Sequence, residues 1–287
     1  MSEKNAKYRF LLVQAFEIPG KSKYYASRAH LPKEEALRNY KDISHLLEDV
    51  DWEIHLGGVP QYGDWAVENR EEFAYAASAR LPAVREAAES GKYNGIILLG
   101  GGEPGFLESR EICRKNNVVV TSCGFSQMHI ATMLGNKFSV IDFAEPHNMY
   151  YYNLVVQHRF DRRCASIRNI GFYHPRPGYD GEPDLTQENI KALNGEHSDA
   201  VEKALEEAES ALREDGAEVL TFGCSGMFWL QPFLQKRLAE KGWEVPVLEG
   251  YSCSIMLAKM MVDMGINASG ITFPGDRPQK RPRRILF

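Results

Sequence analysis

The chain has 287 residues, of which 44% are apolar and 25% charged, a composition typical of a globular protein long enough to bury a sizeable core. Its net charge of -5 gives no basis for nucleic-acid binding. No apolar run reaches the roughly 18–20 residues that span a bilayer, and the first residues lack the pattern of a signal peptide.

Short apolar runs alternate with longer amphipathic stretches along the chain. The apolar runs are continuous, which is typical of strands in a sheet that helices cover on both faces. We expect strands at 8–16, 52–58, 94–100, 117–122, 138–143, 166–172, 217–223 and 245–250. We expect helices at 33–50, 106–116, 198–214 and 231–242. This alternating order predicts an α/β fold with parallel sheets.

Three stretches depart from the alternation. The helical segment 68–91 contains Pro82, where we expect a break or a kink. The segment 172–190 is rich in Pro, Gly and Asp and is expected to form a long surface loop. The tail 271–287 is basic and rich in proline, and we expect it to be an extended arm.

The cysteine pattern argues against a disulfide framework. The number of cysteines is odd and no C-x-x-C pair occurs. In a chain of this size, that usage indicates free thiols and a reducing compartment, so we expect a cytoplasmic protein. The five residues are Cys113, Cys123, Cys164, Cys224 and Cys253.

Two glycine-rich turns are the strongest candidates for chemistry. The sequences IILLGGGEPG (96–105) and VLTFGCSGM (219–227) each pass from an expected strand into a turn and then a helix. In parallel sheets, sites form at the carboxyl ends of strands, and a helix start offers free N–H groups to an anion. We expect this position to lower the pKa of the Cys224 thiol, so that it exchanges protons at a carbon next to a carbonyl. A small residue packed in a tight turn is the alternative interpretation.

The motif FGCSGM (222–227) resembles the second-cysteine motif of the aspartate/glutamate/hydantoin racemase superfamily. GGGEPGFLESRE (100–111) resembles the family turn Cys-Phe-Gly-Asp-Pro-Gly and the helix after it. Further segments in the expected order are similar to the hydantoin racemase branch, namely 136–141, 162–168 and 245–258. The resemblance spans roughly residues 94–265.

The resemblance implies two pseudo-symmetric Rossmann-like subdomains with parallel sheets and an active-site cleft between them. We assign 1–122 plus 248–270 to the first subdomain, 123–247 to the second and 271–287 to the C-terminal arm. The resemblance also implies an isomerase that needs no cofactor and no metal. Two cysteines would flank the substrate carbon, one removing a proton and the other returning one to the opposite face. We expect a small carboxylate or hydantoin-like substrate, no nucleic-acid or membrane partner, and a homo-oligomer.

The chain departs from the family pattern at two places. Gly100 stands where the first cysteine should be, and QAFEIPG (14–20) replaces an early Asn-Pro-Asn-type stretch that helps hold the substrate. One explanation is a single-cysteine enzyme similar to arylmalonate decarboxylase, in which the thiol protonates an enediolate after loss of carbon dioxide. The other is that Cys123, at the end of the next strand, is the second base. A buried structural thiol is the alternative for Cys123.

The expected site therefore combines two thiols with a set of binding groups. Cys224 and Cys123 are the catalytic candidates. Backbone N–H groups of both turns would bind an oxyanion or carboxylate, hydroxyls at a strand end would donate hydrogen bonds, and an aspartate would contact the substrate or cap the next element. The expected binding residues are Gln14, Gly100, Gly101, Gly102, Glu103, Gly105, Thr121, Ser122, Asp142, Ser225, Gly226 and Met227.

The sequence gives less support to other classes of function. A cysteine hydrolase would need Cys224 to contact His174 or His147. The scattered histidines give no zinc-binding spacing, and GGGEPG does not match a dinucleotide fingerprint. A non-catalytic protein that binds a small molecule between the two turns stays open, because one family cysteine is missing.

Overall fold

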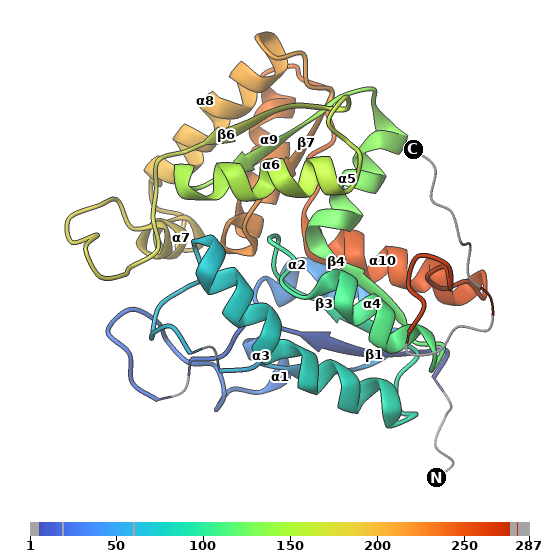
Figure 1. Cartoon of the computed structure of the whole chain (residues 1–287). Coiled ribbons are helices and arrows are strands. Elements are labelled where there is room, and N and C mark those ends of the chain that lie inside the picture. The colour runs from blue at the N-terminus through green and yellow to red at the C-terminus, as the bar shows by residue number, and fades with distance from the viewer. Residues whose placement is uncertain (1–5, 19, 60, 276–279, 281–287) are drawn as a thin grey trace.

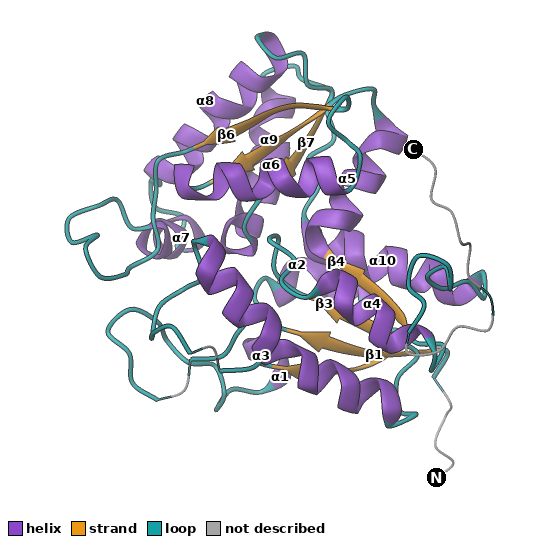
Figure 2. Ribbon diagram, viewed as in Figure 1, coloured by secondary structure: helices purple, strands orange, loops and turns teal. Residues whose placement is uncertain are grey.

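The computed structural model describes residues 6–18, 20–59, 61–275 and 280, and it forms two parallel sheets (Figures 1 and 2). The first sheet has the order β2-β1-β3-β4 and the second β6-β5-β7. The strands are β1 (Tyr8–Val13), β2 (Val50–His55), β3 (Gly95–Leu98), β4 (Val119–Ser122), β5 (Phe138–Asp142), β6 (Cys164–Asn169) and β7 (Val219–Phe222). The α/β class predicted from the sequence is confirmed.

Helices cover both sheets (Figure 2). The α-helices are α1 (Lys33–Ala36), α2 (Tyr40–Ile43), α3 (Arg70–Glu89), α4 (Phe106–Arg114), α5 (Cys123–Leu134), α6 (Asn148–Gln157), α7 (Leu185–Leu193), α8 (Asp199–Arg213), α9 (Gln231–Glu240) and α10 (Gly250–Asp263). Three short 3-10 helices are η1 (Ser44–Leu46), η2 (Glu145–His147) and η3 (Ser225–Leu230).

Alternate residues of β1 show why the first sheet is apolar on both faces. Leu11 and Val13 pack with side chains of α3 and α4. Phe10 and Leu12 face the other way, into the cluster that contains Ile255 of α10. A strand buried on both faces needs a continuous apolar run rather than an alternating one. This explains why the strands are apolar along their whole length instead of alternating between apolar and polar residues.

The second sheet is covered in the same manner. The α8 side chains Ala204 and Leu205 pack in one cluster with Leu220 of β7. On the other face, α5 and α6 contribute Met128 and Leu154 to a separate cluster. Helix α5 connects the sheets, and α10 returns to pack against β3, β4 and α5. The division into subdomains at 122/123 and 247/248 stays a prediction.

Seven of the eight expected strands are confirmed, with ends that shift by a few residues. The eighth, 245–250, contributes only an isolated parallel bridge between Val247 and Leu220. Of the break or kink expected at Pro82, the break is wrong, because α3 continues through this proline. The expected helix 33–50 is also wrong, since it is interrupted between Leu37 and Asn39. The C-terminal arm falls largely outside the described residues.

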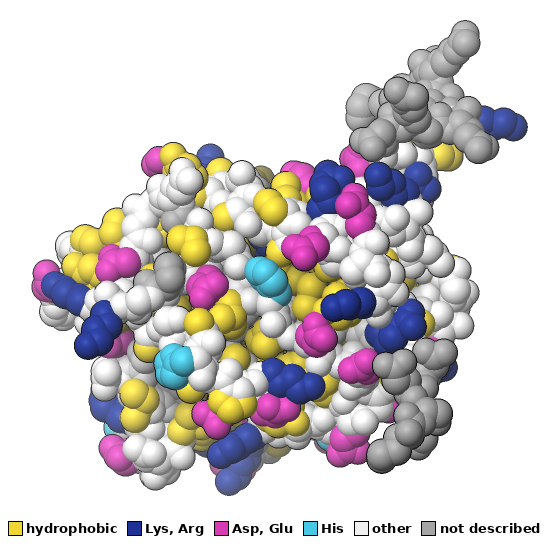
Figure 3. Space-filling model, turned by 90° about the horizontal axis from the view of Figure 1, so that it is seen from below, with side chains coloured by type: hydrophobic (Ala, Val, Ile, Leu, Met, Phe, Trp, Pro, Cys, Tyr) yellow, Lys and Arg dark blue, Asp and Glu magenta, His cyan; other side chains and the backbone are white. Residues whose placement is uncertain are grey.

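Charged side chains of both signs lie on the surface, as expected for a chain with similar numbers of acidic and basic residues. On the face in Figure 3, acidic and basic side chains are interspersed among apolar ones. In the part of the chain that the structure describes, no helix has both the length and the apolar character to cross a bilayer.

Candidate active site

Cys224 lies two residues after the end of β7 and directly before η3. Its backbone N–H donates to Asp142 Oδ1 at 2.9 Å, and its Sγ accepts from the Gly226 N–H at 3.4 Å. Burial and the Asp142 carboxylate raise the pKa of the Cys224 thiol to about 12, although the Gly226 N–H and Arg38 act in the opposite direction. The expectation of a lowered pKa is therefore wrong. The group is a neutral thiol at pH 7, a form that can donate a proton.

Asp142 holds Cys224 in place from the end of β5. It is completely buried, and its Oδ2 lies 3.0 Å from Nδ1 of the buried His147. Burial lowers the pKa of His147, but the charge and hydrogen bond of Asp142 outweigh it, so the net pKa is raised. A Cβ on Gly223 would lie 2.5 Å from Asp142 Cγ, so the turn has no room for a side chain there. Asp142 thus positions Cys224.

The turn after β3 lies against the turn after β7. A Cβ added to Gly101 would lie 1.6 Å from the Gly223 carbonyl oxygen, so the two backbones touch. Gly100 and Gly105 have φ values of 105° and 75°, in the left-handed region that favours glycine. The two turns that the sequence singled out are thus brought together.

Three N–H groups at this contact are available to a ligand. Within the described residues, no protein acceptor takes the backbone N–H of Gly101, Gly102 or Ser225. The N–H groups of Gly226 and Met227 are used inside the turn, by Cys224 Sγ and the Cys224 carbonyl. Such N–H groups stabilise a negative oxygen.

Several predicted binding residues instead hold the protein together. Glu103 Oε1 accepts from Ser122 Oγ at 2.6 Å and from the backbone N–H of Phe125, and its Oε2 lies 2.8 Å from His158 Nε2. The Thr121 hydroxyl donates to the Ser254 carbonyl at 2.9 Å. The Glu103 carboxylate therefore anchors the start of α5.

Gln14 and Cys123 also have partners within the protein. Gln14 Nε2 donates to the Ala36 carbonyl at 3.0 Å. Cys123 is fully buried, with its Sγ 3.6 Å from the Leu98 carbonyl oxygen and 3.9 Å from Ser254 Oγ. Burial and Glu249 raise the pKa of this thiol. In this conformation the Cys123 thiol faces protein groups.

The two histidines that a cysteine hydrolase would need do not activate the thiol. A Cβ on Gly226 would lie 2.6 Å from His174 Nε2 and 3.6 Å from Cys224 Sγ, so His174 is a neighbour of Cys224. Burial, Arg38 and His147 lower the pKa of His174 to about 3. Across the described residues, no hydrogen bond joins Cys224 Sγ to either histidine. The geometry therefore gives no thiolate–imidazolium pair.

Arg80 is a component of the site region that the sequence analysis missed. Its side chain is completely buried, yet its four hydrogen bonds go only to carbonyl oxygens, those of Val13, Gln14, Leu99 and Pro104. It thereby joins the ends of β1 and β3 to the glycine-rich turn. Arg80 lies four residues from the buried Ala76 and Val84. This helical spacing was the signal that could have revealed it.

Among the described residues, no group of three or more His, Cys, Asp or Glu side chains is arranged to hold a metal ion. The five cysteines are free thiols, as expected.

A model of the Asp/Glu/Hydantoin racemase family matches residues 52–258. The chain belongs to this family. Family membership confirms the resemblance carried by the two turns and makes the protein an isomerase of the racemase type.

Individual relatives agree with this placement. A hydantoin racemase of Pseudomonas sp. (strain NS671) is 26% identical over 213 residues, which cover 73% of this chain and 74% of that protein. The structure of allantoin racemase from Pseudomonas fluorescens has a TM-score of 0.68 at 25% identity and covers 95% and 98% of the two chains. A liganded double mutant of arylmalonate decarboxylase has a TM-score of 0.54 at 11% identity, covers 89% and 92%, and shares the fold.

Proposed function

We propose that the protein is a cofactor-independent racemase that moves a proton at the carbon next to a carbonyl of a small hydantoin-like or amino-acid-like substrate. Cys224 is the proton donor and acceptor in this proposal. The observation that carries it is the position of Cys224 beside two touching turns whose Gly101, Gly102 and Ser225 N–H groups have no acceptor in the described protein. Removal of the proton places negative charge on the carbonyl oxygen, and these groups can bind that oxygen.

The protonation state of Cys224 defines its step. As a neutral thiol it delivers its proton to the carbanion, forming a C–H bond as the S–H bond breaks. The thiolate left behind accepts the Gly226 N–H and is stabilised by the charge of Arg38. In the reverse direction, the thiolate removes a proton from the same face. A racemase needs a second base on the opposite face, and Cys123 is our candidate.

The experiment follows the substrate C–H by proton NMR in D2O with a panel of single-enantiomer 5-substituted hydantoins. Wild-type protein should replace the C–H by deuterium and lose optical activity. Cys224→Ser should lower the exchange rate by about 100-fold or more, because the hydroxyl is a far poorer acid and base. Cys164→Ser, which changes a distant free thiol on β6, is the matched control and should leave the rate unchanged.

The assignment of the second base is tested separately with Cys123→Ala. If this variant exchanges deuterium yet preserves optical activity, Cys123 serves the opposite face. Racemisation at the wild-type rate would remove Cys123 from the mechanism. Wild-type exchange in Cys224→Ser would contradict the proposed function itself.

A second candidate is decarboxylation of a malonate-type acid. It is favoured by Gly100, which puts no thiol at the first family position, together with the complete burial of Cys123. In this reaction the C–C bond to a carboxylate breaks, carbon dioxide leaves, the N–H groups hold the enediolate and Cys224 protonates it. Release of carbon dioxide from substituted malonates, with deuterium entering one face only, would favour this candidate over the racemase.

A further inference from the structure

The segment 173–184, which lies between β6 and α7, forms a closed loop that we call the strap. Tyr173 and Asp184 at its two ends form a parallel bridge, and the Leu185 N–H donates to the Tyr173 carbonyl at 3.0 Å. Phe172 and Leu185, which flank the strap, are buried in one cluster with side chains of α8 and β7. The base of the strap is therefore fixed on the side of the second sheet.

Ion pairs hold the tip of the strap to the start of α3, the helix that covers the first sheet (Figure 1). Arg176 Nη1 donates to Glu68 Oε2 and Arg176 Nη2 donates to Glu72 Oε1, both at 2.7 Å. The Tyr179 hydroxyl donates to Glu68 Oε1 at 2.8 Å. The Arg176 side chain is 13% exposed and the two carboxylate side chains 4% and 5%, so salt and water screen this contact less than an ordinary surface pair. The strap thus links the regions of the two sheets.

Between its base and its tip, the strap passes beside Cys224. A Cβ on Gly226 would lie 2.6 Å from His174 Nε2 and 3.6 Å from Cys224 Sγ, so the imidazole and the thiol are close to the same point. The His174 ring also lies 4.9 Å from the ring of Phe143, the residue that follows Asp142. His174 therefore covers one side of Cys224, which is partly exposed as a whole.

Charged groups rather than buried apolar side chains hold the strap in place. None of the residues 173–184 is buried, and Pro177, Gly178 and Gly181 are exposed. Opening would expose little apolar surface and would return the charge of Arg176 and those of its two partners to water. Because burial of an ion pair costs the hydration of both charges, its net contribution to stability is small. A segment held in this way can detach while the rest of the molecule stays folded.

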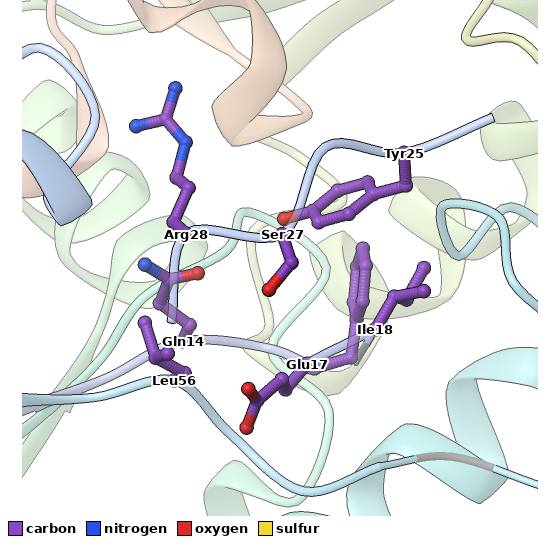
Figure 4. A pocket seen from close by; sticks show the side chains of 8 residues that line it. Gln14, Glu17, Ile18, Tyr25, Ser27, Arg28 and Leu56 are labelled. Atoms are coloured by element: carbon purple, nitrogen blue, oxygen red, sulfur yellow. The ribbon is translucent and has the colours of Figure 1, made fainter. Parts of the chain in front are cut away.

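The surface that receives the tip of the strap is closely packed. Val67 and Phe73, the apolar neighbours of the two glutamates in the sequence, pack in one cluster with Phe16. Side chains from the segments 14–18 and 25–28, Phe16 among them, line a cavity of about 10 Å³ (Figure 4). This volume holds about one water molecule at most. Of the two sides of the contact, the strap is therefore the one with freedom to move.

We infer that the strap is a gate for Cys224. It is closed when Arg176 pairs with Glu68 and Glu72, and it opens when the tip leaves α3, which uncovers the thiol and admits or releases a small molecule. The closed state keeps water from one side of Cys224, and this favours the neutral thiol. The inference concerns access to this thiol, so it goes beyond the proposed racemase activity and does not depend on it.

The test measures the rate at which iodoacetamide alkylates each cysteine at pH 9, by mass spectrometry of the peptides. Arg176→Met should speed the alkylation of Cys224 by about tenfold or more, because loss of the ion pairs shifts the strap toward the open state. An effect of charge alone would act in the opposite direction, since an unpaired Glu68 raises the pKa of Cys224. Arg168→Met, which removes an arginine paired with three carboxylates on the side of the second sheet, is the matched control and should leave the Cys224 rate unchanged.

Two results of this experiment would overturn the inference. One is an equal rate of Cys224 alkylation in wild type and Arg176→Met. The other is an equal acceleration at the buried Cys113 and Cys123, because it would indicate a general loosening of the protein rather than opening of the strap.

A second readout uses the wild-type protein and does not depend on how well Arg176→Met folds. After alkylation of Cys224 by N-ethylmaleimide, the adduct should displace His174 from the space beside the sulfur and hold the strap open. Amide hydrogen exchange in the peptide 173–184 should then be about tenfold faster than in untreated protein, because the tip loses its contacts with α3. Cys224→Ser treated with the same reagent is the control and should keep the untreated rate. Unchanged exchange in the adduct would show that the strap does not cover the thiol.

Discussion

At the scale of single residues, Cys224 is controlled by the carboxylate that holds its backbone. Asp142 accepts the Cys224 N–H and lies next to the thiol, so it fixes the position of the sulfur and opposes its ionisation. A protein that needs a nucleophile lowers the pKa of its thiol, whereas one that needs a proton donor gains from keeping the thiol protonated. The surroundings of Cys224 fit a donor.

The first prediction concerns the pH dependence of Cys224 alkylation. With a pKa of about 12, the alkylation rate by iodoacetamide should rise about tenfold per pH unit from pH 7 to pH 10, because only the thiolate reacts. Asp142→Asn keeps an acceptor for the Cys224 N–H but removes the charge, so the rate at pH 8 should increase at least about threefold. Mass spectrometry of the Cys224 peptide measures both rates. A plateau near the ordinary thiol pKa of about 8.5 in wild type would contradict this account.

The second prediction concerns stability and the His147–Asp142 pair. The folded-state pKa of His147 is raised above the ordinary value of about 6.5. Its stabilising contribution is therefore complete below about pH 6.5 and is lost as pH rises through the raised folded value. The free energy of unfolding in urea should fall over that interval in wild type. In His147→Gln this fall should be absent. An identical pH dependence in both proteins would show that His147 is not the group responsible.

At the scale of elements, local signals predicted more than long-range ones did. The strands could be read because burial on both faces demands continuous apolar runs, and the two glycine-rich turns because backbone geometry demands glycine there. The interruption of the helix at 33–50 was not predicted, because the local periodicity does not contain contacts between separate segments, such as the one that Arg38 makes with Tyr25 at this point. Glu103 and Ser122 were predicted as substrate-binding residues, whereas the hydrogen bond between them depends on contacts that only the fold brings about.

The third prediction tests α3 as the support of the glycine-rich turn. Arg80→Met leaves the carbonyl oxygens of Val13, Leu99 and Pro104 without their donor in a buried place. Each unsatisfied group costs about 1–3 kcal/mol, so the free energy of unfolding should fall by roughly 3 kcal/mol or more. Arg85→Met, an exposed position on the same helix, should change it by less than about 0.5 kcal/mol. Urea denaturation measures both, and similar small losses would contradict the role of Arg80.

At the scale of the whole molecule, the candidate site forms where the turn after β3 of the first sheet touches the turn after β7 of the second sheet. Helix α5 begins at the end of β4, is anchored by Glu103 from the turn after β3, and covers the second sheet with Met128. Helix α10 returns from the second sheet to pack on β3 and β4. The chain therefore crosses between the sheets twice, which fixes the turn after β3 against the turn after β7. The homo-oligomer and the cytoplasmic location stay predictions.

The final prediction probes this contact with one methyl group. In Gly101→Ala the new Cβ would lie 1.6 Å from the Gly223 carbonyl oxygen, a backbone atom of the turn after β7, so the two turns must separate. In Gly102→Ala the nearest atoms, at 2.3 Å, belong to the Phe73 ring, a side chain that can shift. We therefore expect Gly101→Ala to lower the exchange rate by about 100-fold or more, because the N–H groups and Cys224 are no longer held within reach of one substrate. Gly102→Ala should lose less than about tenfold. Circular dichroism would serve to check that both variants are folded. Equal losses of the exchange rate in the two variants would show that the spacing of the turns does not control catalysis.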